Sequence, residues 1–360
     1  MISQTDYAVP TGDFIAEWLE DNGMKPAELA RRTGVSRKHV SKVLAGAPVS
    51  ASFATQLEFV TQIPAERWLA LESLYRADVV RLGMQQELAR EAPPFLEKYK
   101  ASLSRLRKEG LVQGTMRNPG QLAVELMSFF RVGKLEVLAT PERMFEARFH
   151  QSGAFSVEQA SLATWLRLAE LQYASTTIQA DYNENRLWED LPQIRAMSRT
   201  LRDSPSQFIE TLAQVGVIVV LEPEVKGSRA YGATFWQDGH PIIVLSARGK
   251  NDGRLWFTLF HELGHVLLHP DSLHIQGSES VLQDTKTEEE ANSFAADQLI
   301  PPAQRPELYK AKSSAQVRDL AEQMDVSPGV LMQHLHHTKK WLHNRGNKLY
   351  VRVTISEPHS

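Results

Sequence analysis

The sequence predicts a multidomain protein that is mainly α-helical, with one α+β domain in its C-terminal half. Two observations support this. Apolar residues recur at helical spacing through the first 200 positions, and short β-branched runs gather between positions 206 and 250. A chain of 360 residues is also long enough for several domains with their own cores. We expect domains over residues 1–80, 81–205, 206–302 and 303–360.

The composition excludes several classes of protein before any motif is considered. The chain has 40 Lys and Arg against 43 Asp and Glu, a net charge of −3, so a polyanion site would have to be local. It has no cysteine, which excludes disulfides and thiolate metal sites. No apolar run approaches about 18 residues, and residues 1–7 do not resemble a signal peptide. We expect a soluble, cytoplasmic protein that does not bind membranes.

A helix-turn-helix is predicted near the N-terminus, after a first helix over Gly12–Asp21. Residues 26–44 contain a helix, Gly34 at a turn, Ser36 as an N-cap and a second helix. Positions 31–42 hold five Lys and Arg residues and no acidic residue. Such side chains pair with phosphates or with guanine edges in the major groove. The inward positions are Ala30, Val35, Val40 and Leu44, and the candidate DNA contacts are Ser36, Arg37, Lys38, His39 and Lys42.

The run A-E-L-A-R-R-T-G-V-S-R-K-H-V-S-K-V-L-A-G resembles the Cro/repressor-like family, in particular antitoxins of the HigA type. The likeness continues through Pro64–Leu71 to about residue 80. It implies sequence-directed binding to double-stranded operator DNA. Such domains usually dimerise to contact two half-sites, so a homodimer is expected. The alternative is a helical hairpin with a solvated basic face.

Residues 81–205 predict a helical connector whose function the sequence does not indicate. Helical patterns over Gly83–Lys108 and Leu122–Phe130 are interrupted by prolines and glycines. Ala160–Tyr173 is amphipathic, and the aromatic residues on its apolar face are typical of a core.

A small sheet follows. A helix over 208–215 leads to strands over 217–221, 231–236 and 241–245, with a turn at 237–240 between the last two.

A metal site is predicted on the helix that contains F-H-E-L-G-H-V-L-L-H, residues 260–269. Residues four apart in an α-helix differ by about 400° of rotation and about 6 Å of rise, so His261 and His265 project from one face. Two neutral imidazoles suit Zn²⁺, and Glu262 can reach a metal-bound water as general base. The apolar flanks predict burial, which would be costly for these side chains without a metal and hydrogen bonds.

A catalytic zinc normally takes three protein ligands and leaves one position for water. His269 lies one turn further along the helix, where three residues spread over about 12 Å cannot converge on one ion, so we expect it to cap the helix. A second helix over Thr287–Leu299 places Glu288 in an inward stripe with small residues, which favours Glu288 as the third ligand. Glu289 and Glu290 lie about 100° and 200° away, and we interpret them as solvated charges at a helix start.

The hydrophobic pattern of the helix-turn-helix recurs near the C-terminus without its basic residues. We interpret this second copy as a packing or partner-docking element. Four nearby histidines lack an accompanying carboxylate and are expected to be solvated: His334, His336, His337 and His343. Residues 349–355 alternate and predict a terminal strand. The corresponding positions are Leu29, Ala30, Val35, Ser36, Val40 and Leu44 in the first copy, and Leu320, Ala321, Val326, Ser327, Leu331 and Leu335 in the second.

W-F-T-L-F-H-E-L-G-H-V-L-L-H, followed by E-x-E-A-N-x-F-A-A-x-x-L-I-P, resembles the ImmA/IrrE family of metallopeptidases from near position 211 to 302. The resemblance implies a gluzincin-like layout, in which a small sheet leads into the HExxH helix. It carries the family's zinc ligands over to His261, His265 and Glu288, and its general base to Glu262. It also implies an endopeptidase that cuts a helix-turn-helix repressor. Zn²⁺ is the expected cofactor, with Mn²⁺ as the alternative.

Together these features predict a DNA-binding regulator fused to a zinc endopeptidase that cuts a repressor or antitoxin, this chain itself included, to relieve repression. An edge strand beside the metal would hold an extended peptide, and Tyr231 and His240 are candidates for stabilising the oxyanion. Two alternatives stay open. One is an antitoxin-type transcriptional repressor whose metal site is structural or vestigial. The other is a metal-dependent sensor that binds a small effector through the helical connector.

Overall fold

The computed structural model describes residues 7–139, 157–176, 178, 180–202, 206–270, 274–276 and 285–355. The chain divides into two compact units, one holding residues 1–93 and 114–124 and the other residues 94–113 and 125–360. The first unit thus continues past the boundary expected at position 80, to residue 93, and the second unit includes much of the expected connector. None of the helices in the described ranges has the length and apolar character needed to cross a bilayer.

The first unit is helical, as its apolar spacing predicts. Helix α5 continues for 27 residues, well past position 80, which is why the expected domain end is displaced. The helices are α1 (Thr11–Asp21), α2 (Pro26–Thr33), α3 (Arg37–Leu44), α4 (Ala51–Thr61) and α5 (Ala65–Glu91). Their apolar faces meet in one buried core that includes Ile15, Leu19, Leu29, Val40, Phe53, Leu57 and Trp68.

A three-residue turn joins α2 to α3 where the sequence places it. Gly34 has a φ of 73°, a left-handed conformation that glycine adopts without steric cost. The Oγ of Ser36 then accepts a hydrogen bond from the backbone N–H of His39 at 3.1 Å and so caps α3. Ala30 and Val40 are buried, as predicted.

Seven of the described helical segments begin in the range expected as a connector, and α10 among them packs against strand β1 (Ile218–Leu221). The seven are α6 (Pro93–Tyr99), α7 (Leu103–Lys108), α8 (Pro119–Phe130), η1 (Leu135–Ala139), α10 (Val157–Tyr173), α11 (Glu184–Ala196) and η2 (Met197–Arg199). Residues 159–169 of α10 are buried all round the helix, which corrects the one-sided pattern expected for it. The reason is that α10 has neighbours on two sides: Trp165 Nε1 donates to the Glu222 carbonyl at 2.9 Å, and Arg167 Nε donates to the Phe129 carbonyl at 2.7 Å.

The sheet has four strands: β1 (Ile218–Leu221), β2 (Gly232–Gln237), β3 (His240–Leu245) and β4 (His274–Gln276). Their order is β1-β3-β2-β4, with β1 parallel to β3 and the other pairs antiparallel. Asp238 and Gly239 join β2 to β3 with φ of 51° and 81°, as a two-residue hairpin turn requires. The first three strands match the prediction, whereas β4 was not expected because three residues give too short a pattern.

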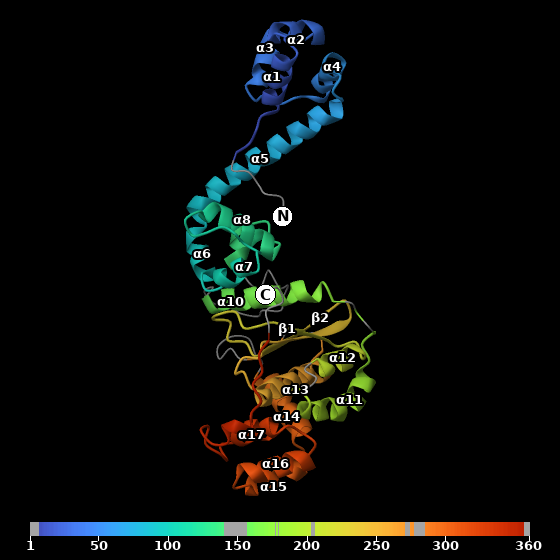
Figure 1. The fold of residues 1–360 in the computed structure, drawn as a ribbon, viewed down its shortest axis with the longest axis vertical. Helices are drawn as coiled ribbons and strands as arrows, with labels where there is room; N and C mark the ends of the chain where they lie inside the picture. The colour runs from blue at the N-terminus through green and yellow to red at the C-terminus, as the bar shows by residue number, and fades with distance from the viewer. Residues whose placement is uncertain are drawn as a thin grey trace. The chain divides into compact units, whose positions relative to one another are not determined.

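Helix α13 (Asp252–Leu268) follows the sheet and forms the centre of the second unit. Figure 1 shows α10 on one face of the sheet and α13 on the other, with α12 (Gln207–Ala213) beside α13. Helices α14 (Thr285–Leu299) and α17 (Pro328–His337) pack against α13. The chain between and after them forms η3 (Pro302–Gln304), α15 (Arg305–Lys310), α16 (Ser314–Gln323) and η4 (Asn347–Leu349).

The second copy of the helix-turn-helix pattern folds locally like the first. Asp325, at the position of Gly34, has a φ of 54°. The Oγ of Ser327 accepts from the backbone N–H of Val330 at 3.2 Å, as Ser36 does in α3. Helix α17 of this pair packs on α13, and α16 packs on α17, which agrees with the interpretation of the copy as a packing element.

Two expectations for the C-terminal region are wrong. His336 is 5% exposed, and both of its ring nitrogens have hydrogen-bond partners, while His334 is half-buried against Tyr309. Only His337 and His343 are exposed among these four histidines. Residues 349–355 form a single bridge, between Asn251 and Arg352, in place of the expected strand.

Gly329→Ala is expected to destabilise the second unit by about 1–3 kcal/mol, because the added Cβ would overpack a buried contact. That Cβ would lie 2.1 Å from Oδ1 of Asp252, a fully buried carboxylate that accepts hydrogen bonds from Ser327 Oγ and the Val351 N–H. Urea unfolding followed by circular dichroism measures the change. Gly133→Ala is the control: its position is exposed with nothing within 4 Å of a Cβ, so its effect should stay within about 0.5 kcal/mol. Equal losses in the two variants would contradict this packing.

Candidate metal centre

The middle of α13 holds three polar side chains in complete burial. His261, Glu262 and His265 are each 0% exposed. They lie among buried apolar residues of the same helix, including Leu259, Phe260, Leu263 and Val266. The four-residue spacing places the two histidine rings together on one face, as the sequence predicts. Groups of this kind are stable in an apolar core only when their polar atoms have partners.

Close packing of α14 against α13 brings a fourth polar group to this face. A Cβ on Gly264 would lie 3.1 Å from the Phe294 ring and 3.3 Å from the Ala291 Cα, so the missing side chain allows the two helices to approach. Glu288, one turn before Ala291 on α14, is thereby placed over the two histidines.

Three potential ligand atoms converge at this point. His261 Nε2 lies 3.0 Å from His265 Nε2 and 3.2 Å from Glu288 Oε2, and His265 Nε2 lies 3.1 Å from Glu288 Oε1. In a tetrahedral zinc site with bonds of about 2.0–2.2 Å, neighbouring ligand atoms are separated by roughly 3.3 Å. The structure therefore brings His261, His265 and Glu288 together in a group that could hold one ion.

The surroundings give these groups the charge states that metal ligation requires. Burial lowers the pKa of His265 to about 3, which keeps its imidazole neutral. Burial acts to raise the pKa of Glu288, but hydrogen bonds with His261 and His265 outweigh it and lower that pKa to about 2, so the carboxylate is ionised. A neutral imidazole and a carboxylate are the forms that bind a divalent ion.

Glu262 lies next to the ligands and faces strand β2. Its Oε2 accepts a hydrogen bond from Thr234 Oγ1 at 2.7 Å, while its Oε1 is buried and has no hydrogen-bond partner in the described part of the chain. A Cβ on Gly232 would lie 2.5 Å from Oε1, so glycine at this position leaves room for the carboxylate. Burial raises the pKa of Glu262 well above its ordinary value, although the Thr234 hydrogen bond opposes the shift.

Sequence reasoning missed two residues that contact the ligands. Asn292 Oδ1 lies 3.1 Å from His261 Nδ1 and orients that ring, and its place in the inward stripe of α14 was the available signal. His274 on β4 is 8% exposed and stacks on His265, with ring centroids 3.8 Å apart. No pattern in the sequence indicates His274, because nothing local relates a residue of a three-residue strand to a helical histidine nine positions earlier.

Other candidates fall outside the converging set. Glu289 is exposed, as expected for a solvated charge, and His269 forms the C-cap of α13, as predicted. Tyr231 stacks with Arg248 and Arg254, and the His240 ring lies 3.1 Å from the Gly216 carbonyl. These contacts give both oxyanion candidates other partners in the described structure.

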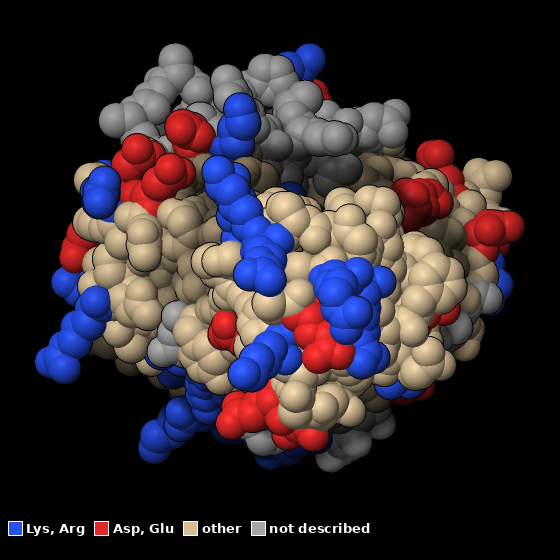
Figure 2. Space-filling model, turned by 90° about the horizontal axis from the view of Figure 1, so that it is seen from above, with Lys and Arg blue, Asp and Glu red and all other residues tan. Residues whose placement is uncertain are grey.

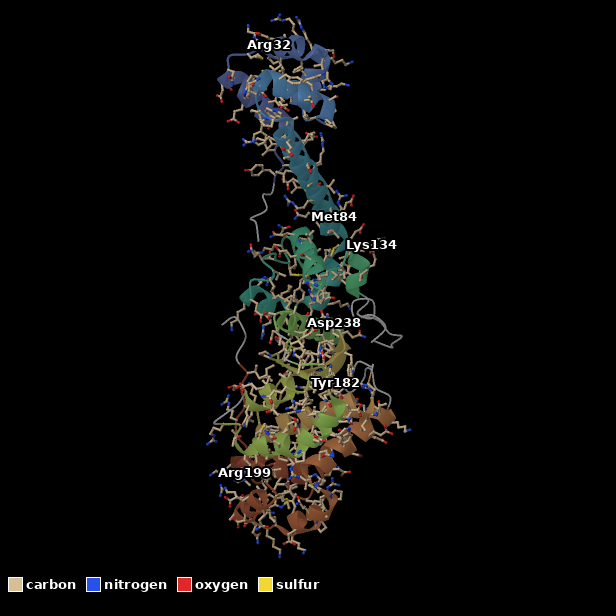
Figure 3. The ribbon with its side chains drawn as sticks, turned by 90° about the vertical axis from the view of Figure 1, so that its right-hand side faces the viewer. Arg32, Met84, Lys134, Tyr182, Arg199 and Asp238 are labelled. Carbon is tan, nitrogen blue, oxygen red and sulfur yellow. The ribbon has the colours of Figure 1, made fainter. Side chains whose placement is uncertain are left out.

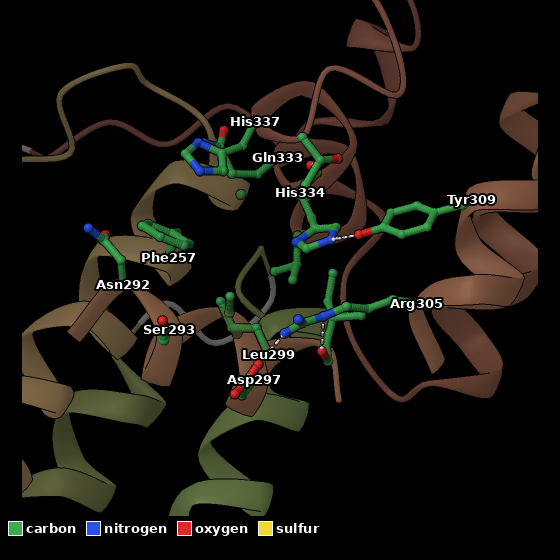
Figure 4. Close-up of a pocket in the computed structure, with 15 residues that line it drawn as sticks. Phe257, Asn292, Ser293, Asp297, Leu299, Arg305, Tyr309, Gln333, His334 and His337 are labelled. Atoms are coloured by element: carbon green, nitrogen blue, oxygen red, sulfur yellow. Dashed lines mark hydrogen bonds and ion pairs between the residues drawn. The ribbon is translucent and has the colours of Figure 1, made fainter. Parts of the chain in front are cut away.

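A cavity of about 340 Å³ begins beside the ligands. Figure 4 shows Phe257 and Asn292 at one end and Arg305, Tyr309 and His334 at the other. Asn292 contacts the ring of His261, so this end of the cavity lies one residue away from the candidate ligands. The remaining walls combine apolar residues, such as Leu299 and Val330, with polar ones, such as Asp297 and Gln333.

In the first unit, most of the candidate DNA contacts lie on the surface of α3. Four of the five are exposed: Ser36, Arg37, Lys38 and Lys42. His39 is half-buried, and its ring meets the Phe53 ring edge-on with 4.8 Å between the ring centroids, which corrects its expected outward position. Arg32, labelled in Figure 3 on α2, forms an ion pair with Glu28 at 2.6 Å. Figure 2 shows lysine and arginine side chains projecting from the surface with acidic residues among them.

Comparison with protein-family models assigns part of the chain. Residues 214–336 match the IrrE N-terminal-like domain, a peptidase family, and the match indicates an ImmA/IrrE-like metallopeptidase domain. It extends beyond the expected boundary at 302 to include the helices that pack on α13. A comparison with curated proteins finds no match. The helical unit that precedes the matched domain is not assigned by these comparisons.

His261→Ala and Glu288→Ala are each expected to abolish stable zinc binding, because only two ligands would remain. Elemental analysis of the purified wild type should find about one zinc per chain. Glu289→Ala is the matched control, since this exposed side chain follows Glu288 on α14, and it should retain zinc. A wild-type protein without zinc after zinc has been supplied would exclude the site.

Proposed function

We propose that this chain is a zinc-dependent endopeptidase joined to a DNA-binding regulatory unit. One observation supports the peptidase half above all others: three ligand atoms meet beside Glu262, whose Oε1 is buried and without a hydrogen-bond partner in the described structure. A purely structural metal site has no use for such a group. The family match over residues 214–336 supports the same reaction class.

The chemistry follows from the positions of these groups. Zinc held by His261, His265 and Glu288 would supply Lewis-acid activation of water and of a peptide carbonyl. The free Oε1 of Glu262 is the acceptor for the proton that the attacking water loses, while Thr234 fixes the other carboxylate oxygen at 2.7 Å. The raised pKa of Glu262 allows it to hold this proton and then donate it to the leaving amine.

The surroundings of the site suit an extended peptide as the substrate. Strand β4 is the last strand in the sheet order, and its His274 stacks on His265, so a peptide paired with this edge would pass the metal. The cavity beside Asn292 and Phe257 would receive one of its side chains. From the resemblance of the motifs, the substrate class is a helix-turn-helix repressor or antitoxin, with this chain itself among the candidates.

The first unit would direct this activity to DNA. Arg37, Lys38 and Lys42 are exposed on α3, which begins with the capped turn typical of recognition helices. Apolar side chains also lie on its surface: Phe59 is 73% exposed and Leu74 is 65% exposed. Their burial between two copies would form the expected homodimer. Cleavage within a DNA-bound repressor would then release its target genes.

The alternative is a transcriptional repressor that uses its metal only for structure. A structural zinc site is normally closed by a fourth protein ligand. The candidate group in the described residues contains His261, His265 and Glu288, which leaves one position for water. The site is therefore built like a catalytic centre.

Glu262→Gln is expected to keep zinc but to lower peptide cleavage by roughly 10²–10⁴-fold, because the amide cannot take up the proton. The probes are a proteome-derived peptide library and the purified chain with added zinc, both followed by mass spectrometry. Glu289→Gln is the matched control and should cleave as the wild type does. If zinc-loaded wild type cuts neither probe, or if Glu262→Gln cuts as fast, the peptidase proposal is wrong.

Replacement of Arg37 and Lys38 by alanine is expected to weaken binding to a mixed-sequence DNA duplex. Each lost phosphate contact should reduce the slope of log K against log salt by about 1. Fluorescence anisotropy across a salt series measures this slope. Lys25→Ala, an exposed lysine before α2, is the control. Equal slopes for the wild type and the variant without Arg37 and Lys38 would show that α3 does not bind the duplex.

A further inference from the structure

The ring of His265 makes a second contact on the side away from Glu288. Its Nδ1 lies 3.2 Å from Nδ1 of His269, and Nε2 of His269 lies 2.8 Å from Oε2 of Glu290. These contacts form a continuous chain from a surface carboxylate to a candidate metal ligand. The side chain of His269 is only 11% exposed, whereas that of Glu290 is 46% exposed, so the chain leads from solvent into the core.

The polarity of this chain follows from what each group can do. An ionised carboxylate only accepts hydrogen bonds, so Nε2–H of His269 donates to Glu290. With His269 in this neutral tautomer, its Nδ1 is an acceptor for a hydrogen bond from His265 Nδ1–H. With an ion bound, His265 would present the lone pair of Nε2 to it, in place of the contact that this atom makes with Glu288. The contact with His269 stabilises this ligating tautomer of His265, because its proton is then on Nδ1.

The same histidines could instead be considered as a second metal site. His265, His269 and His274 have nitrogen atoms close enough to form a candidate group. However, His265 and His274 are stacked face to face, with 6° between their ring planes. Imidazoles bind metals in the plane of the ring, so two parallel stacked rings do not direct their lone pairs to one point. A second ion would also require both nitrogens of His265 as ligands.

We propose that His269 and Glu290 are positioning residues for the metal ligand His265, acting through this hydrogen-bonded chain. Such contacts fix the tautomer and orientation of a ligating histidine and increase its basicity. His261 has a different partner, the neutral amide of Asn292. The anionic chain thus makes His265 the more strongly donating of the two imidazoles. This inference rests on the metal site of the proposed function and assigns to Glu290 a role that its place in an acidic run does not indicate.

The test is zinc affinity, measured by competition with a chromophoric chelator on the full-length chain. His269→Ala is expected to weaken zinc binding roughly 10–100-fold, and Glu290→Ala should weaken zinc binding by a smaller factor. His269→Gln should restore part of the affinity, because its amide can accept from His265 and donate to Glu290. Glu289→Ala, the exposed neighbour on α14, is the control and should bind as the wild type does.

A second measurement separates positioning from general loss of structure. The visible spectrum of the Co²⁺-loaded chain should shift in His269→Ala and Glu290→Ala, while the thermal midpoint of the metal-free chain stays unchanged. Wild-type affinity in both variants would overturn this inference and leave the proposed function intact. Two zinc ions in the wild type, with one lost in both His269→Ala and His274→Ala, would replace it by a second metal site. A wild type that binds no zinc would instead overturn the proposed function, and this inference with it.

Discussion

The close approach of α13 and α14 is the constraint on which the rest of the second unit depends. A metal site of this kind needs ligands from two helices within about 3 Å of one another, and ordinary side chains at the contact would hold the helices further apart. Gly264 removes that obstacle where α14 presents Ala291 and Phe294. The sheet then acts from the opposite side, because Thr234 and the missing side chain of Gly232 determine where the Glu262 carboxylate lies.

Most of the buried polar side chains at the centre of α13 have partners on neighbouring elements. Three fully buried polar side chains would weaken a helix whose neighbours are apolar. Here the Nδ1 atoms of His261 and His265 have partners on α14 and at the end of α13, and Glu262 Oε2 has a partner on β2. Glu262 Oε1 is among the buried atoms that have no hydrogen bond in the described part of the chain, and Glu288 Oε1 and His274 Nε2 at the same site are others.

The sequence predicts the parts of the site that depend on one helix at a time. The spacing of His261 and His265 fixes their common face, and the stripe of α14 identifies Glu288 among three consecutive glutamates. It does not predict contacts that depend on how elements pack, such as Asn292 against His261 or the stacking of His274. The same limit explains the errors elsewhere. His39 turns inward because Phe53 of α4 lies beside it, and α10 is buried on two sides because it has two neighbours.

The first turn of α17 differs from the first turn of α3, its counterpart in the repeated pattern. Helix N-termini attract anions, because their N–H groups and dipole are positive there. At the start of α3 no acidic residue occupies the first turn, so an external phosphate can approach it. At the start of α17 the place is already taken by the chain's own Asp252, whose carboxylate accepts from Ser327 Oγ at 2.7 Å and lies against Gly329. One pattern therefore yields a helix start without an acidic residue in the first unit and a helix start paired with a buried carboxylate in the second.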